Sequence, residues 1–123
     1  MYEEELTYKI RGAVFEVYRQ LGHGFLETVY HKALAYELTQ QGLAVKSEVP
    51  LIALYKNHEV GQYRADLIVE GKILLELKAQ TTLNPASEAQ VINYLKITGL
   101  KLGLLINFNW PKATVKRLVH NHH

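Results

Sequence analysis

The sequence predicts an α/β domain in which a mixed β-sheet is flanked by helices. Three observations support this fold class: helical periodicity up to residue 41, strand-like alternation from residue 45, and a helix placed between two apolar strand-like segments from residue 72 to residue 107. The predicted order of elements is α-α-β-β-β-β-α-β-β.

The first two elements are expected to be helices. Residues 3–21 carry apolar side chains at steps of three and four, the spacing of an amphipathic helix: Leu6, Ile10, Val14, Val17 and Leu21. The segment Gly22-His23-Gly24 should end this helix. A second helix is expected from about Leu26 to Gln41, with Gly42 just beyond its end.

The chain then changes to the alternation of strands. We expect short strands at Val45–Val49 and Leu51–Tyr55, because Pro50 interrupts the alternation between them. Glu59–Val69 predicts a long strand with a bulge at Gly61.

The remaining elements form a strand–helix–strand unit and one last strand. Lys72–Lys78 and Leu102–Asn107 are apolar enough to be central strands covered on both faces, and Ser87–Thr98 between them is helical. A helix that joins two neighbouring strands predicts a parallel crossover. Thr114–Val119 is expected to close the sheet.

Length and composition exclude several classes of protein. The chain of 123 residues fits a single domain over residues 1–123, and we expect residues 118–123 to be a frayed tail. A hydrophobic content of 48% and a charged content of 21% exclude disorder, and the absence of cysteine excludes disulfides and thiolate metal sites. No membrane span and no signal peptide are recognisable, so we expect a cytoplasmic protein that does not bind a membrane.

The charge is unevenly distributed, although the net charge is only +2. Beyond residue 78 the chain has five basic side chains against Glu88 alone. These are candidates for contacts with nucleic acid: Lys96, Lys101, Lys112, Lys116 and Arg117. An ordinary solvated surface is the alternative explanation.

The candidate chemistry lies in two neighbouring strands. Glu76 and Lys78 are two residues apart, so they point to the same face of their strand. Asp66 on the preceding strand joins them only if the loop between the strands has an odd length, such as Glu70-Gly71-Lys72. A two-residue turn at Glu70-Gly71 would instead place Asp66 opposite Leu75.

Two carboxylates and a lysine on one face have a clear chemical use. Carboxylate oxygens suit Mg²⁺ or Mn²⁺, which can neutralise charge on a phosphoryl group and activate a water molecule. The lysine can then orient that water or stabilise the oxyanion. A surface ion pair, such as that of Glu76 and Lys78, is the competing interpretation.

Two further motifs accompany these charged residues. Gln90 and Tyr94 lie four apart on the helix that follows the strand of Glu76 and Lys78, and Gly24-Phe25-Leu26-Glu27-Thr28-Val29-Tyr30 opens the second helix. Taken in order, D-x9-E-x-K and Q-x-x-x-Y resemble the PD-(D/E)XK nuclease superfamily. The string G-x-x-E-x-x-Y is similar to the GxxExxY family within it. The resemblance extends from about Leu6 to Val119.

This resemblance implies a restriction-endonuclease-like fold and a site that hydrolyses phosphodiester bonds with Mg²⁺ or Mn²⁺. We therefore expect a nuclease that acts on nucleic acid, with DNA expected ahead of RNA. By the same resemblance Asp66 and Glu76 are metal ligands, with Glu27 and the Leu77 carbonyl as further ones. Lys78 positions the attacking water. The catalytic set that the resemblance implies is Asp66, Glu76, Lys78, Gln90 and Tyr94. Ala65 stands where the superfamily name has proline.

Aromatic side chains offer contacts to nucleic acid as well. Tyr30 is a candidate, although the helical spacing of Tyr18, Tyr30 and Tyr36 also fits packing in the core. Trp110, in the loop Asn109-Trp110-Pro111, is a candidate wedge for base stacking.

Two other functions remain open at this stage. One is a module on the same fold that binds nucleic acid without cleaving it. The other is a structural or interaction protein whose polar cluster is an ion-pair network. A domain of this size usually needs a partner to embrace a duplex, so a homodimer is expected in the nuclease interpretation.

Overall fold

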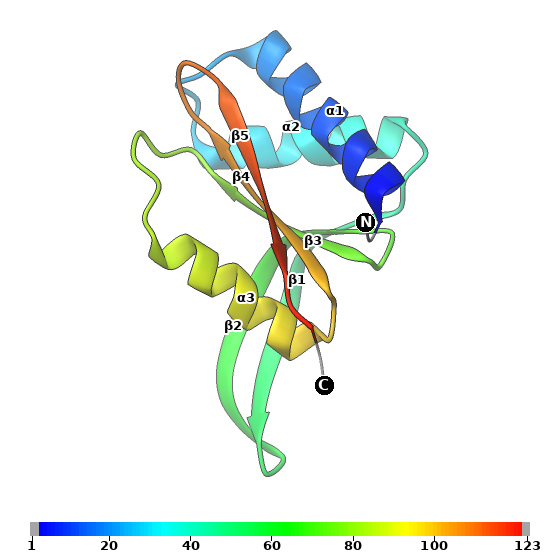
Figure 1. Cartoon of the computed structure of the whole chain (residues 1–123), viewed down its shortest axis with the longest axis vertical. Coiled ribbons are helices and arrows are strands. Elements are labelled where there is room, and N and C mark those ends of the chain that lie inside the picture. The colour runs from blue at the N-terminus through cyan, green and yellow to red at the C-terminus, as the bar shows by residue number, and fades with distance from the viewer. Residues whose placement is uncertain (1–2, 122–123) are drawn as a thin grey trace.

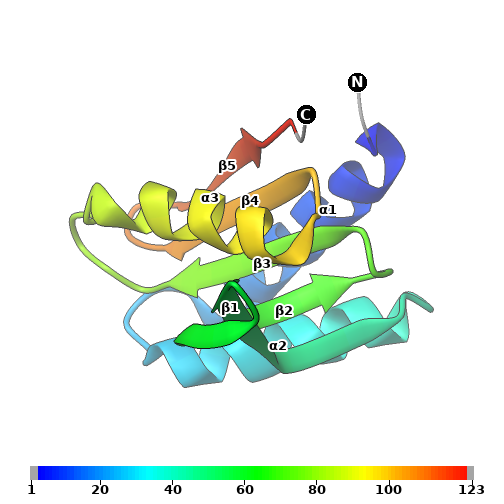
Figure 2. The same cartoon turned by 90° about the horizontal axis from the view of Figure 1, so that it is seen from below.

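The computed structural model describes residues 3–121 and forms three layers, with a five-stranded sheet between helices. Helix α3 covers one face of the sheet and α2 covers the other, as Figure 2 shows from the end of the molecule. The elements in chain order are α1 (Glu4–Leu21), α2 (Glu27–Gln40), β1 (Val45–Tyr55), β2 (His58–Val69), β3 (Ile73–Lys78), α3 (Ala86–Thr98), β4 (Leu102–Phe108) and β5 (Ala113–Val119). The predicted fold class is confirmed.

The strands follow one another across the sheet in the order β1-β2-β3-β4-β5. β3 and β4 are parallel, and the other neighbours are antiparallel, so the crossover through α3 is confirmed. Both central strands are buried along almost their whole length. In Figure 1 the β1–β2 hairpin extends well beyond the remainder of the sheet.

One strand boundary differs from the prediction. The segments Val45–Val49 and Leu51–Tyr55 form a single strand, in which Pro50 keeps its place opposite Arg64. β1 is the edge strand of the sheet, so a residue without an N–H group can be accommodated on its open side. The bulge is confirmed, because the pairing shifts by one residue where β2 contributes the extra residue Val60 next to Gly61.

The loop between α1 and α2 is shaped by its glycines. Gly22 and Gly24 have φ angles of 70° and 100°, a region that side chains with a Cβ rarely adopt. The chain therefore reverses within a few residues, which brings the start of α2 beneath the sheet near the end of β3.

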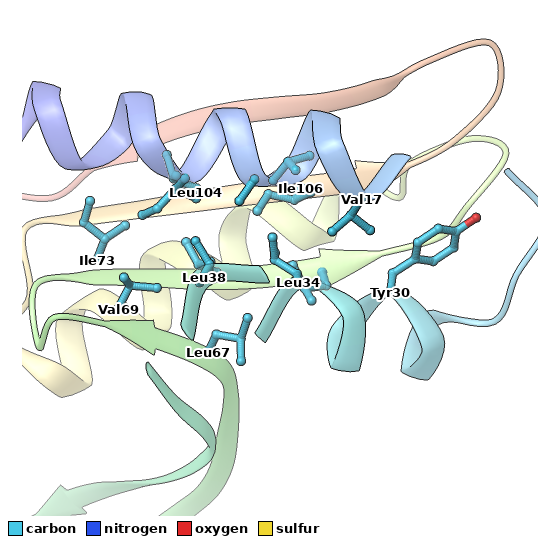
Figure 3. Close-up of a cluster of buried hydrophobic side chains, with 14 of the residues drawn as sticks. Val17, Tyr30, Leu34, Leu38, Leu67, Val69, Ile73, Leu104 and Ile106 are labelled. Carbon is cyan, nitrogen blue, oxygen red and sulfur yellow. The ribbon is translucent and has the colours of Figure 1, made fainter. Parts of the chain in front are cut away.

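Two apolar clusters hold the layers together. The larger one joins the predicted apolar stripe of α1 to α2 and to the sheet, and Figure 3 shows its central side chains, among them Val17, Leu34, Leu38 and Ile106. The smaller one packs α3 on the opposite face through Val91 and Leu95. The site described below lies on the α3 face.

The end of the described chain corrects a second expectation. Leu118 and Val119 belong to β5 and pair with β4, and the His120 N–H donates to the Lys101 carbonyl at 2.9 Å. The expected frayed tail therefore does not begin at residue 118, and its last two residues lie outside the described part. Within residues 3–121 no helix is long and apolar enough to cross a membrane.

Candidate functional site

The sheet forks where β2 leaves β3. The two strands pair only over residues 67–69 of β2, and just before this segment they exchange hydrogen bonds between side chains and backbone. The Asp66 N–H donates to Glu76 Oε1 at 3.0 Å, and the Leu77 N–H donates to Asp66 Oδ2 at 2.7 Å. Buried backbone N–H groups that lose their ladder partner need another acceptor. The two carboxylates supply it and are thereby fixed side by side.

The register that the site requires is confirmed. Leu67 lies opposite Leu75, and the loop between the strands is the three-residue segment Glu70-Gly71-Lys72. The same register brings Asp66 to the level of Glu76. The alternative two-residue turn, which would have separated the carboxylates, does not occur.

Glu76 and Lys78 lie on the α3 face, because side chains alternate along β3 and Leu74 packs into the cluster beneath α3. Alternation along β2 is interrupted around Asp66, since Ala65 and Ile68 both pack into that cluster. The position of Asp66 beside Glu76 therefore follows from the two hydrogen bonds that join their carboxylates to the backbone. Glu76 is 4% exposed, whereas Asp66 and Lys78 are half-buried.

A cleft of about 800 Å³ runs along α3 beside these residues. Its wall includes Lys78 at the end of β3, Gln80 just after it, Tyr63 from β2, and Gln90, Tyr94 and Lys96 from α3. Among its described lining residues there is no aspartate or glutamate. The cleft is therefore neutral to positive, with the carboxylates set at its edge, and it suits an anionic chain.

The two polar side chains predicted on α3 both face this cleft. The Oε1 atom of Gln90 is buried and, within residues 3–121, has no hydrogen-bond partner. It is therefore available to accept a hydrogen bond from a ligand or a water. The ring of Tyr94 lies 5.7 Å from the ring of Tyr63, centroid to centroid, so two tyrosines line one side.

Glu27 approaches from the other side of the sheet. It is the first residue of α2, and its carboxylate is close enough to Lys78 and Asp66 for their charges to act on its pKa. It remains exposed, however, and residues 3–121 contain no group of three or more acidic, histidine or cysteine side chains arranged to hold a metal. The structure thus brings Glu27 into the neighbourhood of the pair without completing a three-ligand set.

The crowding of acids changes their protonation. Burial, together with the charge of Asp66 and the smaller effect of Glu27, raises the pKa of Glu76 to about 8, although the hydrogen bond from Asp66 and the charge of Lys78 oppose the rise. Loss of hydration raises the pKa of Glu27, against the effect of Lys78, and Asp66 adds to the rise. Burial likewise raises the pKa of Tyr94, with the charge of Glu76 as the next cause.

The donor set fits a divalent cation of the Mg²⁺ type. Such ions often take only one or two protein carboxylates and fill their other positions with water and substrate phosphate oxygens. Asp66 and Glu76 each use one oxygen for a backbone hydrogen bond, which leaves a second oxygen on each. A cation at the pair would also compensate the repulsion that raises the pKa of Glu76.

Tyr30 corrects one prediction. It is fully buried, stacks on Phe108 at 4.4 Å between ring centroids, and donates from its hydroxyl to the Gly22 carbonyl at 2.6 Å. Figure 3 shows its ring within the core. Tyr30 therefore ties the α1–α2 loop to the helix and is not available to nucleic acid. The Leu77 side chain is buried as well, so only its backbone carbonyl remains a candidate ligand.

The five basic residues beyond residue 78 do not form one surface, contrary to what a single basic end would require. Lys96 lines the cleft, and Lys112 lies in the β4–β5 loop at the same end as Lys78. Lys116 is bound by Glu88 at 2.8 Å. Arg117 points to the opposite face, where it donates to Thr7, and Lys101 precedes β4 at the far end of the sheet.

One supporting residue escaped the sequence analysis. Asn107 is 4% exposed, lies beside Lys78 in the parallel pairing, and forms two hydrogen bonds of 2.9 Å with the backbone of Gln80. It fixes the segment that continues from β3 into the cleft. The available signal was a polar side chain at the end of an otherwise apolar strand.

Comparison with known proteins decides the family. The model of the PD-(D/E)XK nuclease superfamily matches residues 4–118, nearly the whole chain. The chain belongs to this superfamily. The superfamily generally hydrolyses phosphodiester bonds, so its members act on nucleic acid.

Structural comparison agrees on the fold of this superfamily member. The crystal structure of SSO0001 matches with a TM-score of 0.62 at 13% identity, covering 100% of this chain and 81% of that protein. At this identity the likeness concerns the fold alone. No match is found among curated proteins.

Proposed function

We propose that this protein is a nuclease that hydrolyses phosphodiester bonds with the help of Mg²⁺ or Mn²⁺. The observation that carries the proposal is the exchange of hydrogen bonds between Asp66 and Glu76 at the fork of β2 and β3, with Lys78 on the same face. Carboxylates fixed in this way present their remaining oxygens beside a cleft without acidic lining. A phosphodiester chain can enter that cleft without meeting negative charge before it reaches the pair.

The residues take separate roles. Asp66 and Glu76 would hold the cation, with Glu27 and the Leu77 carbonyl as additional ligands, and the bound ion would supply charge neutralisation at the phosphate. Lys78 orients the attacking water and stabilises negative charge on the phosphoryl oxygens. Near these groups, Gln90 offers its free amide oxygen as a hydrogen-bond acceptor for water or substrate, and Tyr94 contacts the substrate backbone.

The ion-pair interpretation is less well supported. In the described chain no salt bridge joins Lys78 to Asp66 or Glu76, although the charge of Lys78 acts on the pKa of Glu76. The carboxylates bind backbone N–H groups instead, which leaves the lysine free to act on a ligand. A module that binds without cleaving would use the same cleft, and only an activity measurement separates it from a nuclease.

Finer assignments belong to the same proposal. We place the chain in the GxxExxY family, because Gly24 has a positive φ angle, Glu27 begins α2 near the site, and Tyr30 secures the turn between them. We propose DNA ahead of RNA as substrate, and the cytoplasm as the compartment.

A homodimer is proposed as the working form. The β1–β2 hairpin exposes apolar side chains, among them Leu54 and Val60, each 63% exposed. A second copy of the chain could cover them, and its cleft would then extend the surface offered to a duplex. Light scattering on the native chain and on a Leu54→Ser, Val60→Ser variant tests this, since the dimer predicts loss of association in the variant.

The decisive experiment is a cleavage assay over a panel of labelled substrates. Single-stranded, duplex and branched DNA and single-stranded RNA are incubated with the protein in Mg²⁺, in Mn²⁺ and in EDTA. We expect cleavage of at least one DNA substrate with either metal and none in EDTA. Asp66→Asn and Glu76→Gln should abolish it, because each removes charge that binds the cation.

The matched control is Glu59→Gln, an exposed carboxylate on the hairpin. It should cleave like the wild type. Cleavage that survives in Asp66→Asn, or that is equally fast in EDTA, would contradict the metal site. Metal-independent binding to the panel with no cleavage by the wild type would favour the binding module.

A further inference from the structure

A second hollow lies next to the cleft, at the end of the sheet where three loops meet. It has a volume of about 350 Å³ and is lined by the α1–α2 loop, the segment after β3 and the β4–β5 loop. Figures 1 and 2 both show these loops at the same end of the molecule. Gln80 lines both this hollow and the cleft that contains Lys78, so the two spaces adjoin at this residue.

The hollow is aromatic. Trp110 is 66% exposed and Phe25 is 47% exposed, and the ring of His23 lies 6.2 Å from that of Trp110 in an edge-to-face arrangement. Phe108, which is buried, forms part of the wall of this hollow. Large aromatic surfaces left in water beside an active-site cleft are typical of ligand contacts rather than of packing.

The loop that presents Trp110 is fixed on both sides. The Tyr18 hydroxyl donates to the carbonyl of Asn109, and the Asn109 side-chain amide donates to the Thr81 carbonyl at 2.9 Å. Asn107 in turn holds the backbone of Gln80 through two hydrogen bonds. The backbone next to Trp110 is therefore fixed relative to the cleft, which lowers the entropy cost of ordering the loop when a ligand stacks on the indole.

We propose that this hollow is a subsite for an unpaired nucleobase of the strand whose phosphate lies at Lys78. The inference rests on the proposed function, because it takes the cleft as the path of a phosphodiester chain. A flat base is the ligand that aromatic rings stack with regardless of sequence. The described lining residues include no acidic side chain, so the sugar-phosphate chain entering from the cleft meets no repulsion there.

A nucleobase bound in this hollow implies a substrate with an unpaired nucleotide. In a duplex both faces of a base are covered by its stacked neighbours, and its edge is engaged in pairing. It can reach Trp110 only after it leaves the stack. The protein should therefore prefer nucleic acid whose nucleotide beside the cleaved bond is unpaired, as in single strands, frayed ends or branch points.

The test uses the tryptophan itself, because Trp110 is the only tryptophan in the chain. Its fluorescence is titrated in EDTA with a 12-nucleotide oligothymidylate, with a strand of equal length and charge that has abasic residues, and with a hairpin duplex of the same length. We expect saturable quenching by the oligothymidylate, weak quenching by the abasic strand and little by the duplex. Trp110→Ala should weaken binding of the oligothymidylate about ten-fold or more, measured by anisotropy of a labelled strand.

Two variants separate stacking from loss of structure. Trp110→Phe keeps an aromatic face and should retain most of the affinity, and Tyr36→Ala, which removes an exposed aromatic side chain on α2, should change nothing. Equal quenching by single strand and duplex, equal binding of the abasic strand, or unchanged affinity in Trp110→Ala would each overturn the subsite. An apolar peptide that quenches in place of the oligonucleotide would overturn it too.

The subsite and the proposed hydrolysis can fail separately. Cleavage that needs Asp66, does not distinguish single strand from duplex in the wild type and is unchanged in Trp110→Ala removes only the subsite. Tryptophan-dependent binding of single strands by a protein that never cleaves keeps the subsite and removes the hydrolysis.

Discussion

The buried carboxyl of Glu76 should make the stability of the protein fall as the pH rises. Burial and the neighbouring acids raise its pKa from the usual 4.5 to about 8 in the native state. Between these values the native state holds a proton that the unfolded chain has already lost, so the free energy of unfolding decreases with pH. The slope is at most about 1.4 kcal/mol per pH unit. The total loss between pH 5 and pH 8 is on the order of 3 kcal/mol.

The perturbation is Glu76→Gln. A glutamine stays neutral at every pH, and its carbonyl oxygen can still accept the hydrogen bond from the Asp66 N–H. We therefore expect the variant to be more stable than the wild type at pH 8 by a few kcal/mol, and the two to be similar at pH 5. A weaker slope should remain in the variant, because the pKa of Glu27 is raised as well.

The assay is urea unfolding followed by circular dichroism at half-unit steps from pH 5 to pH 8, in EDTA so that no cation binds. Glu59→Gln, at an exposed position on the hairpin, should follow the wild-type profile. A flat wild-type profile would refute the reasoning. So would the same slope in Glu76→Gln as in the wild type.

Three further outcomes follow from the site and its supports. Millimolar Mn²⁺ should raise the melting temperature of the wild type and leave that of Asp66→Asn unchanged. The rise should be larger at pH 8 than at pH 5, because the cation competes with the proton for the carboxylates. An equal shift in both proteins would contradict the assignment of Asp66 as a metal ligand. Tyr30→Phe should lower the free energy of unfolding by about 1–3 kcal/mol in urea unfolding, because a carbonyl in the α1–α2 loop loses its donor, and an unchanged midpoint would count against this support. Lys96→Ala should weaken oligonucleotide binding and reduce its salt dependence in anisotropy titrations, because Lys96 lines the cleft. Lys116→Ala should cause a smaller loss of affinity, because Glu88 already neutralises that lysine. A larger loss of affinity in Lys116→Ala than in Lys96→Ala would show that the cleft is not the path of the strand.

Much of the fold could be predicted because local patterns and packing agree. The apolar stripe of α1 is buried from Leu6 to Val17 and half-buried at Leu21, and the apolar centre of β3 is a central strand covered on both faces. The odd loop Glu70-Gly71-Lys72 also followed from a requirement of the chemistry and is present. The prediction that Pro50 divides two strands was wrong, because a proline is tolerated in a strand at the edge of a sheet. Whether a strand lies at an edge depends on the assembled sheet and not on the local sequence.

The residues of the site could be predicted from the sequence, but most of the hydrogen bonds that hold them in place could not. Sequence parity placed Glu76 and Lys78 on one face, but the hydrogen bonds between carboxylates and backbone depend on the fork between β2 and β3. Tyr30 shows the limit of a motif, because its spacing does not distinguish a ligand contact from a hydroxyl that ties down a loop. The basic residues of β5 were separated by strand alternation once the faces of the sheet were known.

The central claim is that Lys78 acts in phosphodiester hydrolysis beside a metal held by Asp66 and Glu76. Single-turnover cleavage of the best DNA substrate in Mg²⁺, with the dissociation constant measured separately in EDTA, tests it most directly. Lys78→Ala should cleave slower by about two orders of magnitude or more while its dissociation constant changes little, and Lys72→Ala, at the opposite end of β3, should behave as the wild type. A Lys78→Ala protein that cuts as fast as the wild type would contradict the account.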